Sequence, residues 1–154
     1  MTAVIRNARS DDIPAMVDLL HLLFSIEADF AFEPVRQRRG LAAMLDGCGK
    51  HRCIKVAEVQ DQVVGMGSGQ TLISTAEGGI VALVEDVVVL PAWQGQGIGG
   101  RLLESVEAWA RRHGATRLQL LADRSNGAAL KFYERAGWGE TRLICLRRKL
   151  SCPT

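Results

Sequence analysis

The 154-residue sequence has no long apolar run, little excess of either charge and few cysteines, and each shortage excludes a class of protein. Its apolar stretches span only a few residues, as at Val87–Trp93, whereas a membrane-spanning helix needs about 20. Lys and Arg total 19 against 17 Asp and Glu, a net charge of +2, while nucleic-acid-binding proteins carry a strong basic excess. We therefore expect neither a membrane nor a nucleic acid as partner.

The start of the sequence and its four cysteines favour a cytoplasmic protein without a metal. Arg6 and Arg9 come before any apolar segment of signal-peptide length, and cytoplasmic thiols stay reduced. Cys48, His51 and Cys53 lie close together, but a zinc site needs a fourth ligand, and the sequence has no second CxxC or HxxxH pair. We expect a basic loop at 48–53 that leads into a strand.

What the sequence does contain is the composition and patterning of one mixed α/β domain over residues 1–154. Hydrophobic residues make up 47% and charged residues 23%, which is ordinary globular usage. Alternating and helical apolar spacings, with glycine and proline between them, predict strands and helices in turn. The expected elements are, in order, a strand at Val4–Ala8, a helix from Ser10 to about Phe24, a helix at Pro34–Leu45, a hairpin from Cys53 to Ile73, a strand at Ile80–Leu90, a helix from Ile98 to His113, a strand at Leu118–Leu121, a helix at Asn126–Arg135 and a strand at Leu143–Leu150.

A glycine-rich segment, Gln94-Gly95-Gln96-Gly97-Ile98-Gly99-Gly100, joins a predicted strand to a predicted helix. Glycine lets backbone N–H groups turn toward a ligand, and the helix N-terminus adds partial positive charge, which together predict a phosphate or pyrophosphate site. A Walker A loop would need Gly-Lys-Ser/Thr, where Arg101 stands instead. The dinucleotide pattern GxGxxG is matched, but the acid expected about 20 residues on is absent, because position 120 is Leu.

A third interpretation rests on a resemblance. Residues Val84–Leu103 resemble motif A of the GNAT superfamily, the acyl-CoA-dependent N-acyltransferases: Gln94-x-x-Gly97-x-Gly99 fits its Gln/Arg-x-x-Gly-x-Gly/Ala pattern. Asn126–Trp138 is similar to motif B, in which an Asn begins a helix that Tyr and Gly-aromatic close. Ile5–Asp12 is similar to the family's first strand and helix start. The resemblance covers nearly the whole chain and implies a single mixed, mostly antiparallel sheet flanked by helices.

The resemblance also implies acetyl-CoA as cosubstrate and assigns residues to it. Backbone amides would hold the pyrophosphate, namely those of Gln94, Gly95, Gln96, Gly97, Ile98, Gly99 and Gly100. The end of the preceding strand would pair with the pantetheine arm as an added strand does, through Val87, Val88 and Val89, and family members have a bulge there. Asn126 would hydrogen-bond the same arm, although Asn is equally suited to capping a helix.

Acyl transfer to an amine needs a base, an oxyanion donor and an acid. Glu85 is the expected base and Asp86 the alternative, because a carboxylate on an apolar strand is costly without a role. Strand alternation would place the two on opposite faces, with Glu85 on the face of Val87 and Val89. The resemblance puts the oxyanion donor on a backbone N–H near Val87 and the acid that protonates the thiolate on Tyr133, the only tyrosine.

The segment after the first helix is expected to build the acceptor site, and its residues favour two interpretations. Carboxylates and aromatic rings suit a cation, and they are Phe24, Glu27, Asp29, Phe30, Phe32 and Glu33. Three arginines that follow suit an anionic group, and they are Arg36, Arg38 and Arg39. We expect a primary amine of a small molecule, attacked directly in a ternary complex. The alternatives are a protein lysine or N-terminus, or a non-catalytic acyl-CoA-binding regulatory domain, and the resemblance is compatible with a homodimer.

Overall fold

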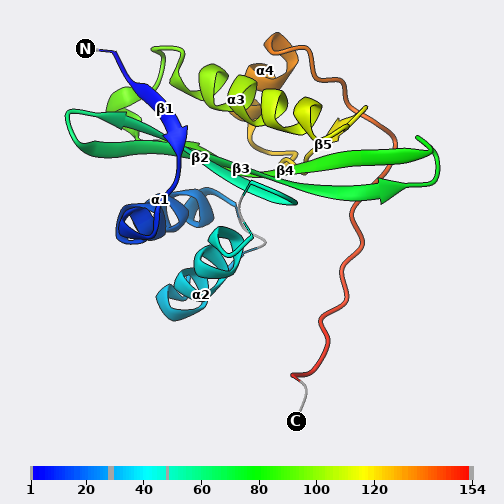
Figure 1. The fold of residues 1–154 in the computed structure, drawn as a ribbon, viewed down its shortest axis with the longest axis horizontal. Helices are drawn as coiled ribbons and strands as arrows, with labels where there is room; N and C mark the ends of the chain where they lie inside the picture. Colours follow the sequence, from blue (N-terminus) through cyan, green and yellow to red (C-terminus); the bar gives the residue numbers. More distant parts are fainter. Residues whose placement is uncertain (1, 28–29, 48, 153–154) are drawn as a thin grey trace. The chain divides into compact units, whose positions relative to one another are not determined.

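A five-stranded sheet is the framework of the unit Met1–Leu120 (Figure 1). The computed structural model describes residues 2–27, 30–47 and 49–152. The strands lie in sequence order, and they are β1 (Val4–Asn7), β2 (Arg52–Val59), β3 (Gln62–Ser74), β4 (Gly79–Val89) and β5 (Leu118–Gln119). The first four are antiparallel and β5 is parallel to β4, so the predicted mixed, mostly antiparallel sheet is confirmed.

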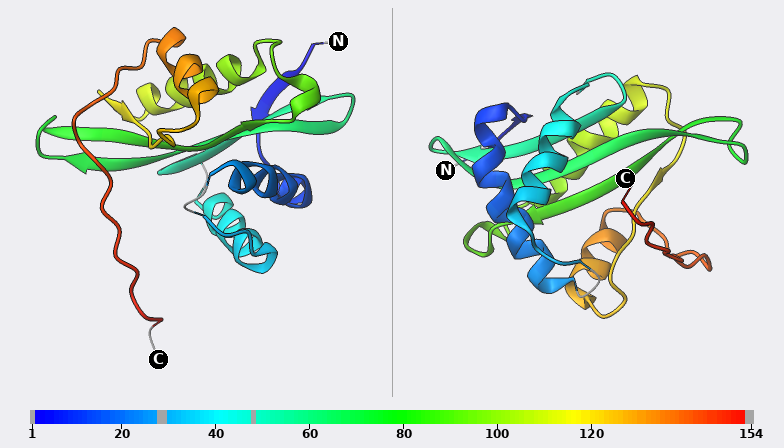
Figure 2. Two further views of the ribbon diagram at one scale, coloured as in Figure 1. Left: turned by 180° about the vertical axis from the view of Figure 1, so that it is seen from behind. Right: turned by 90° about the horizontal axis from the view of Figure 1, so that it is seen from below.

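Two helices cover one face of this sheet and one helix covers the other (Figures 1 and 2). The helices α1 (Ile13–Ile26) and α2 (Pro34–Leu45) pack their apolar sides on Ile54 and Val56 of β2, and Met66 of β3 joins the same core. The alternate residues of the strands face α3 (Ile98–Arg112) in a second core. Each face therefore has its own hydrophobic core, as period-2 strand patterning requires.

Close packing fixes α3 against the sheet. Three glycines alternate along β3 on the side of α3: a Cβ added at Gly65 would lie 3.2 Å from Leu102, and one at Gly69 would lie 2.9 Å from Val106. Side chains at Gly65 and Gly69 would push the helix away from the sheet, whereas a Cβ at Gly67 would make ordinary contacts. The glycines thus set the position of α3, including the segment at its N-terminus.

The rest of the chain, Leu121–Thr154, is a second compact unit, and a single domain over 1–154 stays a prediction. It contains one helix, α4 (Gly127–Arg135), and the described residues 136–152 form neither helix nor strand. The predicted strand at Leu143–Leu150 is therefore wrong, and Leu143 and Leu146 are more than four-fifths exposed. A strand forms only where a neighbouring edge pairs with it, and an apolar pattern cannot say whether one is available.

Other differences are small. The start of the first helix is a 3₁₀ turn at Ser10–Asp12, and β5 has two residues instead of the four predicted. No helix in the described ranges is long and apolar enough to cross a membrane.

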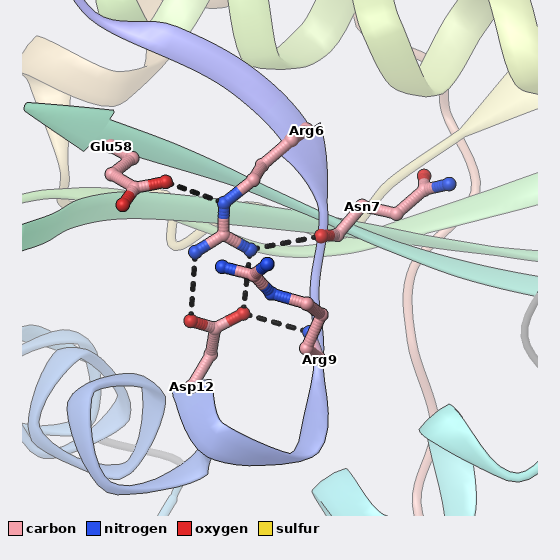
Figure 3. Close-up of polar contacts among 5 residues, drawn as sticks. All are labelled: Arg6, Asn7, Arg9, Asp12 and Glu58. Carbon is pink, nitrogen blue, oxygen red and sulfur yellow. Dashed lines mark hydrogen bonds and ion pairs between the residues drawn. The ribbon is translucent and has the colours of Figure 1, made fainter. Parts of the chain in front are cut away.

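An arginine ties the first strand to the first helix (Figure 3). The guanidinium of Arg6 donates to both oxygens of the buried Asp12 carboxylate, at 2.8 and 2.9 Å, and its Nε donates to Glu58 at 2.6 Å. The Arg9 backbone N–H donates to the same carboxylate at 2.7 Å. The hydrogen bonds from Arg6 hold the pKa of Asp12 below its ordinary value, so the native state favours the carboxylate.

We expect Asp12→Asn to lower the free energy of unfolding by about 2 kcal/mol at pH 7, because it breaks charge-assisted hydrogen bonds at a buried position. The folded-state pKa of Asp12 lies below its unfolded value near 4, so its contribution is complete above that value and is lost as the pH falls through and below it. Urea unfolding at pH 7 and pH 3 should therefore give a difference that shrinks in acid. Asp11→Asn, at the exposed neighbouring residue, is the matched control; equal effects of the two variants would contradict this assignment.

Candidate active site

A bulge interrupts β4 near its carboxyl end. In the ladder with β3, Ser68 lies opposite Glu85 and Met66 lies opposite Val88, so two residues of β4 face one residue of β3. Asp86 is one of the two, and its φ of 55° is left-handed, which Asp tolerates better than most residues. The bulge that the family resemblance implies is present, and two acidic side chains stand at it.

The bulge changes which face each side chain occupies. Val87 lies on the α3 side, since a Cβ at Gly67 would be 3.7 Å from its Cγ2, whereas Val88 belongs to the core under α1. Glu85 lies opposite Ser68, on the same side as Val88. The prediction that Glu85 shares a face with Val87 and Val89 is therefore wrong. The extra residue in the ladder breaks the strict alternation on which that prediction rested.

The outer edge of β4 has no strand beside it from Val84 onward within the described part of the chain. The last strand, β5, pairs only with Ala82 and Leu83. An unpaired edge offers backbone N–H and C=O groups that an extended ligand can pair with. Val87, Val88 and Val89 all lie on this stretch, so it has the geometry that their predicted role needs.

The glycine-rich segment forms a turn between β4 and α3. The Gln94 side chain donates from Nε2 to the Val89 carbonyl at 2.9 Å, which fastens the start of the turn to the end of β4. Gly95 and Gly97 have φ values of 77° and 81°, a left-handed conformation that favours glycine. Space is open where a Cβ would stand on either one.

The turn delivers the N-terminus of α3 without a side-chain cap. Gly97 is the N-cap residue, and no side chain accepts from the first turn, whose residues are Ile98, Gly99 and Gly100. Ile98 is buried and anchors the turn, while Gln96 is exposed. Free N–H groups at a helix N-terminus favour an anion, so this turn has the geometry that the predicted phosphate site requires, and its role stays a prediction. Arg101 borders it and donates to the Ala3 carbonyl at 2.8 Å.

Two other carboxylates contribute to the electrostatics of Asp86. Burial raises the pKa of Asp86 to about 7, and the charges of Glu85 and Glu27 add to the rise. Partial burial also raises the pKa of Glu85, which is the more exposed of the two. Glu27 is the C-cap residue of α1, where its N–H bonds the Leu23 carbonyl at 3.0 Å. The sequence placed Glu27 only in the acceptor segment, and no local signal shows that the end of α1 reaches β4.

The other residues of the acceptor segment are the aromatic rings and carboxylates that would suit a cation and the arginines that would suit an anion. Phe24 and Phe30, three residues to either side of Glu27, pack with ring centroids 5.3 Å apart, and Phe32 stacks on His21 at 4.1 Å. Glu33 pairs with Arg36 on the exposed side of α2, at 3.1 Å. Arg38 and Arg39 are exposed on the same helix, and Asp29 and Cys48 lie outside the described residues. Of the described residues in this segment, Glu27 is the one whose charge contributes to the raised pKa of Asp86.

Two predicted site residues lie in the second unit. Asn126 caps α4, and its Oδ1 accepts from the Ala129 N–H at 3.1 Å, so the capping interpretation is confirmed. Tyr133 packs edge-on against Phe132 and Trp138, with centroids 5.1 and 5.9 Å away. Gly137, with a φ of 92°, closes the helix. The roles of Tyr133 as acid and of Asn126 as a ligand of the pantetheine arm stay predictions.

Comparison with known proteins identifies the class. The acetyltransferase (GNAT) family model matches residues 15–138. The aminoalkylphosphonate N-acetyltransferase of Salmonella typhimurium is 30% identical over 138 residues, which cover 89% of this chain and 85% of that protein. The chain belongs to the GNAT acetyltransferase family, and its activity class is N-acetyl transfer.

Solved structures share the fold along nearly the whole chain. A transcriptional regulator from Bacillus halodurans C-125 is similar with a TM-score of 0.83 and 26% identity, over 96% of this chain and 99% of that one. The aminoglycoside N-acetyltransferase AAC(6')-Iy, in complex with CoA, is similar with a TM-score of 0.82 and 17% identity, over 96% and 94%. At 17% identity, the similarity to the aminoglycoside N-acetyltransferase shows a shared fold alone.

We expect Asp86→Asn to stabilise the protein increasingly as the pH rises from 4 to 8. The folded-state pKa of about 7 lies above the unfolded value near 4, so ionising Asp86 costs stability across this window, and Asn removes the cost. Asn also tolerates the left-handed φ. Thermal unfolding at several pH values measures the difference from wild type.

The control is Asp61→Asn, at an exposed turn residue with a φ of 64°, which keeps the backbone conformation but not the burial. A difference at Asp86 that does not change with pH would contradict the expected cost of ionising it.

Proposed function

We propose that this N-acetyltransferase transfers the acetyl group of acetyl-CoA to a primary amine of a small molecule, by direct attack in a ternary complex. The observation that carries the proposal is the end of β4. There, an unpaired strand edge, a bulge with two carboxylates and an uncapped helix N-terminus follow one another within 16 residues, from Glu85 to Gly100. The strand edge supplies backbone groups that can pair with an extended arm, and the nearby helix N-terminus supplies N–H donors for an anion.

The residues that would bind acetyl-CoA fit its two kinds of polar group. Space is open where a Cβ would stand on Gly95, Gly97 and Gly100, so a ligand can approach the backbone of Gln94–Gly100, whose amides suit the pyrophosphate. The edge at Val87–Val89 suits the amide groups of the pantetheine arm, and Asn126 is proposed to hydrogen-bond the same arm. The thioester supplies a carbonyl carbon that a neutral amine can attack.

The carboxylate pair Glu85 and Asp86 supplies the base in this proposal, with Glu85 as the first candidate. An alkylammonium has a pKa near 10.4, so a proton must leave before the nitrogen can attack. The neutral nitrogen then bonds to the carbonyl carbon to give a tetrahedral oxyanion, and the carbon–sulfur bond breaks as this intermediate collapses. Of the two protons that the ammonium loses, one passes through the base to solvent before attack. The other leaves nitrogen after attack and restores the Tyr133 phenol, which has protonated the thiolate, so the net products are an amide, a thiol and a proton. A backbone N–H near Val87 donates to the oxyanion.

The acceptor is proposed to be small because of the family relative with 30% identity, whose name gives an aminoalkylphosphonate as its substrate. A cytoplasmic location and a homodimer stay predictions. The proposal is tested by mixing the protein and acetyl-CoA with a panel of small primary amines, a lysine peptide and a peptide with a free N-terminus, and measuring released thiol. Activity on small amines supports it, and activity on peptides alone overturns the acceptor class. Binding of acetyl-CoA without any transfer would favour the non-catalytic alternative.

We expect Glu85→Gln to lower kcat about 100-fold at pH 7.5, the low end of the range for removing a general base. The wild-type kcat/KM should rise with pH, because the base acts in its ionised form and partial burial raises the pKa of Glu85; a rise centred near 7 would instead match Asp86, whose pKa is raised to about 7. Steady-state rates from pH 5.5 to 9 check both points. If only Asp86→Asn lowers kcat, Asp86 is the base instead of Glu85. If both variants keep full activity, neither carboxylate is the base.

We expect Tyr133→Phe to lower turnover tenfold or more while acetyl-CoA binding is retained, because the substitution removes only the phenolic hydroxyl that would donate the proton. Released thiol gives the rate, and calorimetric titration gives the affinity. Trp138→Phe is the control, because it trims a ring packed on Tyr133 and leaves the hydroxyl in place. Unchanged turnover of Tyr133→Phe would exclude this residue as the acid.

A further inference from the structure

We propose that Ser68 is a positioning residue for acyl transfer: its buried hydroxyl holds the Glu85 carbonyl at the bulge and so aims the next backbone N–H, that of Asp86, at the outer edge of β4. The inference rests on the proposed function and adds to it a residue of the neighbouring strand, β3. It starts from one contact, in which the Ser68 Oγ donates to the Glu85 carbonyl oxygen at 3.0 Å.

Ser68 is one of three polar or charged residues that are buried in the described part of the chain, with Asp12 and Lys55. The side chains of Asp12 and Lys55 both bind side chains of β1. Ser68 instead binds the main chain of β4, at the last ladder position before the extra residue. Since a buried hydroxyl without a partner is unfavourable, the Glu85 carbonyl accounts for a serine at a place where a strand core otherwise takes an apolar residue.

The hydroxyl lies where the backbone of β4 most needs support. Asp86 and Val87 occupy, between the ladder positions of Glu85 and Val88, the place that a regular strand gives to one residue. The φ of Asp86 is 55°, an unfavourable conformation that persists only where the surroundings hold it. Rotating the Glu85–Asp86 peptide group out of this conformation would take its carbonyl away from the Ser68 hydroxyl and leave a buried donor unpaired. The contact therefore resists relaxation of the bulge.

The geometry of a peptide group carries this support to the other side of the strand. A peptide group is planar and trans, so its N–H points away from its C=O. Because the Glu85 carbonyl is directed at Ser68 on β3, the Asp86 N–H is directed at the opposite edge, which has no strand beside it from Val84 onward in the described chain. This N–H adjoins Val87, where the proposed function places the oxyanion donor. The hydrogen bond that the carbonyl accepts also polarises the peptide group and strengthens its N–H as a donor.

Ser68 would act on the reaction only through this peptide group. The negative charge on the thioester oxygen develops as the amine attacks, so a correctly aimed N–H contributes more to the transition state than to binding of the cosubstrate. Loss of the hydroxyl should therefore lower kcat and leave the affinity for CoA, which lacks the acetyl carbonyl, almost unchanged. A merely structural role would instead lower the midpoint of thermal unfolding and leave the kcat of the folded protein unchanged.

The experiment compares wild type, Ser68→Ala and Ser68→Thr with acetyl-CoA and the small primary amine on which wild type is most active. We expect Ser68→Ala to lower kcat about tenfold, less than the roughly 100- to 1,000-fold loss for deleting an oxyanion donor, because the N–H is misaligned and not removed. Calorimetric affinity for CoA should change less than twofold, and Ser68→Thr, which keeps the hydroxyl, should recover most of kcat. A wild-type kcat in Ser68→Ala, or an equal loss in Ser68→Thr, would overturn the inference and leave the proposed function standing.

Ser74→Ala is the matched control. This serine lies at the far end of the same strand, where its Oγ accepts from the Glu77 N–H at 3.3 Å, away from the bulge. Its kcat should stay at the wild-type value. A loss in Ser74→Ala as large as that in Ser68→Ala would contradict a specific role of Ser68.

A spectroscopic measurement tests the same inference without turnover. In the ¹⁵N-labelled wild-type protein, acetyl-CoA should move the amide proton resonance of Asp86 further downfield than CoA does, because only acetyl-CoA brings a carbonyl oxygen to this N–H. The difference between the two ligands should fall by at least half in Ser68→Ala. An equal difference in wild type and Ser68→Ala would overturn the inference. Absence of thiol release from wild type with every amine would overturn the proposed function instead, and the resonance of Asp86 would still decide the role of Ser68.

Discussion

The extra residue in β4 is the constraint on which the rest of the site depends. Without the bulge, Glu85 and Val87 would lie on one face and the strand would present a regular ladder. With it, Glu85 joins the α1 side, Val87 the α3 side, and Asp86 takes a left-handed conformation between them. Such a conformation costs on the order of 1–3 kcal/mol and persists only where the surroundings hold it. The two cores on either side of the sheet provide that support.

The bulge and the anion site are coupled through the backbone. The turn that leads to α3 begins at Gln94, whose side chain donates to the Val89 carbonyl, and Val89 lies only two residues after the bulge residue Val87. The helix is then held down on β3 by packing over Gly65, Gly67 and Gly69. A shift in the register of β4 would therefore move the turn relative to a helix that cannot follow it. The Gln94–Val89 hydrogen bond and the packing of α3 on β3 together fix the spacing between the carboxylates and the N-terminus of α3.

Local features of the site could be predicted from the sequence, and long-range ones could not. The turn at 94–100 has a signature in four glycines before an amphipathic helix, and the cap at Asn126 has one in its residue type. The bulge has none, since Val84 precedes the pair Glu85–Asp86 and three valines follow it, as they would in a regular strand. The approach of Glu27 to β4 depends on the length of α1 and its packing across the sheet. The segment 143–150 has the apolar pattern of a strand, but no described strand pairs with it, so the local pattern alone predicts an element that does not form.

Opposite ends of two helices explain how one short strand segment can serve two ligands of opposite charge. The N-terminus of α3, with partial positive charge, follows β4 on one face of the sheet, and the C-terminus of α1, with partial negative charge, reaches β4 from the other. An anionic cosubstrate and a cationic acceptor would each meet the favourable end. The protein as a whole is close to neutral, with a net charge of +2, so the separation is local and does not come from its overall charge.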